Sequence, residues 1–178
     1  MTQTGKEAIV GDIRSSIEAA VKYLSEHPDE ARYTDPAATA TMQDGLRFHV
    51  TGAGGEEIVT DMPAAVGGSG SAPSPGWLFR AAVASCSASL IAMEAARAGV
   101  RVSRLDVAVD SESDDRGILG MEPSVPAGPL SVRIHVQIEA EGVEPSALEG
   151  VARRGIGRCP VVDGVRRAVE TTIELESS

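Results

Sequence analysis

Two cysteines, Cys86 and Cys159, carry the most specific chemical signal in this chain of 178 residues. Cys159 stands directly before Pro160 at a predicted helix start, where unpaired backbone N–H groups and the positive end of the helix dipole favour a thiolate. Cys86 lies inside the most apolar predicted helix, where burial favours the neutral thiol unless a cation or a dipole compensates. Two such thiols could form a redox pair, in which one becomes a sulfenic acid and the other condenses with it.

The alternative for either cysteine is a structural role, because a free cysteine often packs as a small buried hydrophobe. The residues alone favour neither interpretation for Cys86. For Cys159 the Cys-Pro helix start favours reactivity, because such a thiol lies near the surface in a positive field.

Other catalytic chemistry has little support in the sequence. The three histidines, His27, His49 and His135, and the two cysteines, 73 positions apart (159 − 86), show no pair at metal-ligand spacing. A Ser-His-Asp hydrolase would need the G-x-S-x-G elbow, which the sequence lacks. We therefore expect no metal and no hydrolytic triad.

The charge of the chain argues against nucleic acid and anionic membrane surfaces as partners. Sixteen basic and 26 acidic residues give a formal net charge of -10, which repels phosphate groups. The longest uncharged apolar run, residues 81–93, is shorter than the ~20 residues of a membrane span. No secretory signal is visible at the N-terminus, so we expect a cytoplasmic protein, in which two cysteines suit transient redox work better than a permanent disulfide.

Periodicity and turn residues predict an alternation of helices and strands in one domain. Helices are expected at residues 12–26, 77–97, 145–158 and 161–169, and strands at 46–51, 57–61, 105–110, 130–139 and 171–176. The Gly- and Ser-rich segment 62–76 is expected to be an ordered or semi-ordered loop before the long apolar helix, which should lie at the centre of the fold. This order predicts an α+β fold with a largely antiparallel sheet.

Several motifs together resemble the OsmC and organic hydroperoxide resistance (Ohr) family. They are GGSGSAPSPGWLFRAAVASC at residues 67–86, Cys159-Pro160-Val161, and the loop at residues 114–120. The similarity covers residues 40–176, which makes 1–39 an N-terminal helical extension and 40–178 the OsmC-like domain. The resemblance implies an intertwined homodimer, in which sheets wrap around long central apolar helices.

The resemblance also implies a function, that of a thiol peroxidase acting on small organic hydroperoxides. Carried over to this chain, Cys86 would be the peroxidatic cysteine and Cys159 the resolving cysteine. The partners implied are a second copy of the chain and an external dithiol reductant, with no metal or organic cofactor.

The chain departs from the family pattern next to the helix that bears Cys86. Well-studied members have an acidic residue after the helix-opening proline, paired with an arginine that holds the thiolate, whereas here Pro75 is followed by Gly76 and Trp77. Segment 62–76 contains no arginine, so the candidate cations are Arg47, Arg80 and Arg116. This departure motivates a second hypothesis, a non-catalytic protein that binds an apolar small molecule in an interface cleft near Trp77, Phe79 and Cys86.

Overall fold

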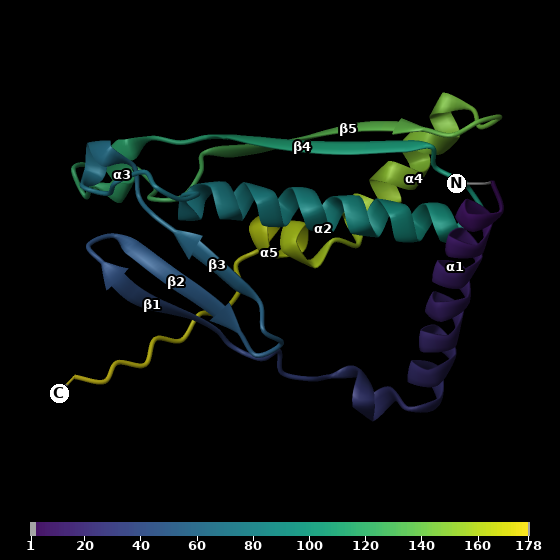
Figure 1. Ribbon diagram of the computed structural model, residues 1–178, viewed down its shortest axis with the longest axis horizontal. Helices are drawn as coiled ribbons and strands as arrows, with labels where there is room; N and C mark the ends of the chain where they lie inside the picture. The colour runs from purple at the N-terminus through teal and green to yellow at the C-terminus, as the bar shows by residue number, and fades with distance from the viewer. Residues whose placement is uncertain (1–2, 178) are drawn as a thin grey trace. The chain divides into compact units, whose positions relative to one another are not determined.

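The computed structural model describes residues 3–177 and combines helices with antiparallel sheets, which confirms the predicted α+β class (Figure 1). The helices are α1 (Gln3–Glu26), α2 (Pro75–Arg97), α3 (Asp115–Ile118), α4 (Pro145–Gly157) and α5 (Pro160–Arg166), with short 3-10 turns η1 (Pro28–Ala31) and η2 (Ala64–Val66). The strands are β1 (Ala38–Asp44), β2 (Arg47–Gly52), β3 (Glu57–Thr60), β4 (Arg104–Glu112) and β5 (Ser131–Glu139).

The chain divides into two compact units. Residues 15–82 form one unit, and residues 83–177 form the other together with the start of α1. Helix α1 begins nine positions earlier than the predicted residue 12 (12 − 3) and ends, as predicted, before His27-Pro28. Val21 and Leu24, which lie at helical spacing, are 54% and 42% exposed in the single chain.

The unit of residues 15–82 contains a three-stranded antiparallel sheet in the order β1-β2-β3. The predicted hairpin is present, with Val50 opposite Ile58 in β2 and β3. Strand β1 was not predicted, although Gly45-Leu46 forms the turn that joins it to β2, and Gly45 adopts the positive φ (52°) that such a turn needs. The sequence of β1, ATATMQD, lacks the alternation of large apolar and polar residues that predicts a strand, and all of its residues are exposed.

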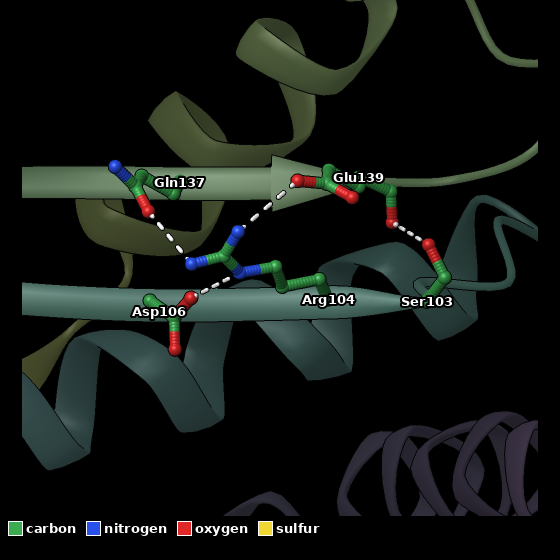
Figure 2. A network of polar contacts seen from close by, with 5 residues as sticks. All are labelled: Ser103, Arg104, Asp106, Gln137 and Glu139. Carbon is green, nitrogen blue, oxygen red and sulfur yellow. Dashed lines mark hydrogen bonds and ion pairs between the residues drawn. The ribbon is translucent and has the colours of Figure 1, made fainter.

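The other sheet is the antiparallel pair β4-β5, in which the predicted alternation is present along its whole length. Its polar face carries a network that Figure 2 shows: the Arg104 guanidinium binds Asp106 of its own strand and Gln137 and Glu139 of β5. Arg104, Asp106 and Glu139 each have more than half of the side chain exposed. This face is therefore the solvent side of the sheet.

The apolar face of β4-β5 covers α2 and α4 (Figure 1). The centre of this core is formed by Ile91 and Ala95 of α2 with Val151 and Ala152 of α4. Half-buried residues of both strands pack against it, including Val107 and Val136, which lie opposite each other in the sheet. Burying these aliphatic side chains contributes about 1.5–3 kcal/mol for each large one.

Only one stripe of the apolar helix α2 is buried in the single chain, although the sequence predicts that this helix lies at the centre of the fold. The stripe holds Val83, Ser87, Ile91 and the segment 94–96, at the spacing of one helical face. By length and composition α2 could also cross a membrane, and 17% of its most apolar window is buried. Core helices of soluble proteins have the same length and composition.

The C-terminal end of the chain differs from its prediction. Residues 171–176 form no strand, and Ile173 and Leu175 are 77% and 90% exposed. The alternation of apolar residues there has no neighbouring strand in the described chain to pair with, so the pattern alone does not produce a strand.

Candidate functional site

The two cysteines lie within the same unit, and both are free thiols. Cys86 is half-buried in the middle of α2, and Cys159 is the N-cap residue of α5 with 1% of its surface exposed. Although they are 73 positions apart in sequence (159 − 86), their thiols interact directly. The fold therefore brings the predicted pair together.

Ser87, the neighbour of Cys86, is the third member of this cluster. It is fully buried, and its hydroxyl donates a hydrogen bond to the sulfur of Cys159 across 3.9 Å, a long contact typical of sulfur acceptors. A serine inside an apolar helix gave no signal for this role in the sequence, because serine hydroxyls in helices often bond to their own backbone. Ser89, two positions further on, does so with the carbonyl of Ser85.

The two thiols have opposite pKa shifts. Burial raises the pKa of Cys86, and the neighbouring Cys159 raises it further, while the N–H of Val161 lowers it only in part. Burial also raises the pKa of Cys159. Four hydrogen-bonding groups outweigh this effect: the N–H of Val162, the thiol of Cys86, the hydroxyl of Ser87 and the N–H of Val161. The pKa of Cys159 therefore lies below the ordinary thiol value. The two N–H groups act without the regular geometry of a side-chain cap. When this pair loses one proton, Cys159 is therefore the favoured site of the negative charge.

The position of Cys159 depends on how α4 packs against α2. Glu94 of α2 is buried and binds Arg154 at 2.9 Å and also Arg158, the residue directly before Cys159. Between this ion cluster and Ser87, the backbones approach closely, since a Cβ on Gly155 would lie 2.6 Å from the Cα of Ile91. Ser87, Ile91 and Glu94 share one face of α2. This face holds the α4-α5 junction at three points.

Among the described contacts, none joins the predicted supporting residues, Arg116, Arg47 and Trp77, to the thiols. Arg116 lies in α3, where its guanidinium is bound to Asp114, the N-cap residue of that one-turn helix. Arg47 belongs to the unit of residues 15–82 and binds Gln43 and Ser71. Trp77 lies in the first turn of α2 and is 49% exposed.

The Gly- and Ser-rich loop before α2 is ordered around a buried carboxylate that sequence reasoning missed. Asp61, 2% exposed, accepts hydrogen bonds from the Ser69 hydroxyl at 2.5 Å and from the N–H and hydroxyl of Ser71 at 3.0 Å. The Ser69 hydroxyl and the Ser71 N–H hold the pKa of Asp61 far below its usual range. All contacts lie within one unit, and we assign Asp61 to loop structure.

The unit that carries the cysteines also contains a groove. This groove, of about 660 Å³, lies between β5 and α4, is lined in part by Arg104, Leu148 and Ala152, and contains neither cysteine. Among the side chains that the structure describes, no three from His, Cys, Asp or Glu come together as metal ligands. The thiol cluster is thus the feature with the most specific chemistry in this unit.

Comparison with known proteins defines the class of this fold and site. The family model described as OsmC-like protein matches residues 68–174, which is more than half of the chain and includes both cysteines. The chain therefore belongs to the OsmC-like protein family, as its motifs indicated. No curated protein sequence matches it.

Solved structures show the same fold at low sequence identity. An OsmC-like protein from Mycoplasma pneumoniae is 13% identical, with a TM-score of 0.63 over 76% of this chain and 89% of that one. An organic hydroperoxide resistance protein OsmC from Legionella pneumophila is 19% identical, with a TM-score of 0.56 over 75% and 92%. One from Elizabethkingia anophelis, also 19% identical, has a TM-score of 0.57 over 76% and 90%.

Proposed function

We propose that this chain is a thiol-dependent peroxidase that reduces small organic hydroperoxides through Cys86 and Cys159. The observation that carries the proposal is the direct interaction of these two thiols, which the fold brings together from distant parts of the sequence. Membership of the OsmC-like family supports it, as do the hydroperoxide resistance proteins among the structures with this fold.

The proposed cycle assigns attack to Cys86 and resolution to Cys159. Cys86 is the more accessible of the two thiols. Its thiolate attacks the peroxide and becomes a sulfenic acid, and Cys159 then displaces water to form a disulfide. An external dithiol reductant returns both cysteines to thiols. We place this cycle in the reducing cytoplasm, with no metal or organic cofactor.

The proposal includes a homodimer and an extension. Most residues of α2 are not buried in the single chain, and a second copy of the chain would cover the exposed apolar surface, as the resemblance implies. Residues 1–39 are assigned to a helical extension outside the OsmC-like domain of residues 40–178. Deleting the extension should leave hydroperoxide consumption intact, and loss of activity in a folded deletion variant would refute this division.

The test of the peroxidase proposal is consumption of cumene hydroperoxide in the presence of a dithiol reductant. The wild-type protein should consume it, and Cys86→Ser should not. Equal, slow consumption by both proteins would refute the proposal.

Two observations favour a second candidate function, a non-catalytic protein that binds an apolar small molecule. The pKa of Cys86 is raised by burial and by Cys159, which reduces its thiolate fraction, and Trp77 is half-exposed where the family has its acidic motif. Trp77 is the single tryptophan, so its fluorescence would report a ligand near α2. A change in Trp77 fluorescence with an apolar ligand, in a protein inactive toward hydroperoxides, would favour this candidate.

A further inference from the structure

The sulfur atoms of Cys86 and Cys159 differ in the number of groups that can stabilise negative charge. Cys159 is approached by the Ser87 hydroxyl, the Cys86 thiol and the N–H groups of Val161 and Val162. Cys86 is approached by the N–H of Val161 and by Cys159 itself. A thiolate is stabilised by such donors, so Cys159 is the better holder of the charge.

The thiol that better stabilises negative charge, Cys159, is also the less accessible of the two. Cys159 has 1% of its surface exposed, whereas Cys86 is half-buried. A hydroperoxide therefore meets Cys86, which carries the proton. Only the thiolate attacks, so the proton of Cys86 must go to an acceptor as the peroxide reacts.

We propose that Cys159 is this acceptor, a general base for Cys86 as well as its resolving partner. The Ser87 hydroxyl and the N–H groups of Val161 and Val162 keep the buried sulfur ready to take the proton. This role presupposes the peroxidase function proposed above, and it gives the chain a means of activating Cys86 without the arginine and glutamate of the family pattern.

The acidic side chains nearest the pair along α2 and α5 are already partnered. On α2, Glu94 binds Arg154 and Arg158 of the α4 end. On α5, Asp163 binds Arg167 at 2.5 Å. These ion pairs leave the proton transfer to the two thiols themselves.

The reaction balances with one shared proton. The pair starts as a Cys86 thiol and a Cys159 thiolate, and the proton moves from Cys86 to Cys159. The Cys86 thiolate attacks the peroxide oxygen, the O–O bond breaks, and the Cys159 thiol gives the proton to the departing alkoxide, forming the alcohol. The regenerated Cys159 thiolate attacks the Cys86 sulfenic acid, so the disulfide forms and hydroxide leaves, to be protonated by solvent to water. The peroxide is reduced by two electrons, and the two cysteines are oxidised by two.

The deciding experiment is the first turnover of Cys159→Ser, measured by trapping the Cys86 sulfenic acid during reaction with cumene hydroperoxide. A cysteine that only resolves acts after this step, so its loss would leave the rate of sulfenic acid formation unchanged. A general base acts within it, and general-base removal typically costs 10²-fold or more. We expect the rate at pH 7 to fall at least about tenfold, and an unchanged rate would overturn the inference.

A second measurement uses an electrophile and does not depend on peroxidase activity. The rate at which iodoacetamide alkylates Cys86 in the wild-type protein should level off at a pH below the ordinary thiol pKa of about 8.5, because it follows the titration of Cys159. In Cys159→Ser it should rise until that pKa or beyond. If the alkylation rate of the wild-type protein instead rises until an ordinary or raised thiol pKa, the inference fails. This outcome needs only the wild-type protein, so it holds even if Cys159→Ser does not fold. If this profile is found but hydroperoxide is not consumed, the proposed function fails and the proton transfer stands.

Discussion

At the scale of single residues, the chemistry depends on the surroundings of Cys159. Its sulfur is buried, and donors from α2 and from the start of α5 stabilise its charge. Ser87 is the donor whose side chain can be removed without touching either thiol. The contribution of a donor to a charged acceptor is larger than to a neutral one.

Replacing Ser87 by Ala should raise the pKa of Cys159 toward the ordinary thiol value and lower its thiolate fraction at pH 7 about two- to fivefold. Thiolate absorbance in the ultraviolet, followed against pH, measures this change. The matched control is Ser89→Ala on the same helix, because the Ser89 hydroxyl binds the Ser85 carbonyl and no thiol. Identical titrations of the two variants would show that the Ser87 hydroxyl does not stabilise the thiolate.

At the scale of elements, the thiol pair depends on the packing of α4 against α2. The contact has a close backbone approach at Gly155 and an ion cluster around Glu94. Gly155 lies four positions before Cys159 (159 − 155), and Arg158, a partner of Glu94, lies directly before it. Each feature can be altered separately. Their removal should affect stability and the thiol pair together.

Adding a methyl group at Gly155 should push α4 away from α2, because its Cβ would lie 2.6 Å from the Cα and 2.7 Å from the backbone N of Ile91. Neither backbone atom can give way, so we expect Gly155→Ala to destabilise the protein by about 1–3 kcal/mol in urea denaturation. Gly157→Ala is the control, since open space surrounds that position. Equal stability of the two variants would contradict the close helix contact.

Replacing Glu94 by Gln should destabilise the protein by about 1–2 kcal/mol, less than a fully buried pair would lose, because Arg154 and Arg158 remain half-exposed to water. The Cys86–Cys159 disulfide should also form more slowly in this variant. Glu149→Gln provides the control, because its partner Arg153 is 77% exposed and such surface pairs contribute little. Matching urea midpoints and disulfide rates would rule out Glu94 as an anchor of Cys159.

The sequence predicted the longer helices and most strands, because their apolar periodicity is regular over many residues. Contacts between different helices and strands could not be predicted from the sequence. The sequence of α2 does not indicate that Glu94 forms ion pairs, since its partners Arg154 and Arg158 lie 60 and 64 positions away. The predicted strand at residues 171–176 failed for the converse reason, because its alternation has no neighbouring strand to pair with in the described chain.

At the scale of the whole molecule, the surface of α2 is the feature that a single chain leaves incomplete. A helix of this apolar composition is expected to be covered on several faces, yet only one stripe is buried. Exposed apolar surface of this kind marks a site of association. The proposed homodimer would cover it.

Sedimentation equilibrium should therefore give a mass of twice 18.4 kDa at micromolar concentration. Trp77→Lys, which places a charge on the first turn of α2, should weaken the dimer. Tyr33→Lys should not, because Tyr33 is 78% exposed on an irregular segment. A mass of 18.4 kDa for the wild-type protein would refute the proposed dimer.

The most direct test of the thiol-pair account is a single turnover of the reduced protein with one equivalent of cumene hydroperoxide, followed by thiol counting and peptide mass spectrometry. The account predicts loss of both thiols and a disulfide between Cys86 and Cys159 within one chain, with none formed in Cys86→Ser. Two intact thiols in the wild-type protein, with the hydroperoxide unconsumed, would contradict it.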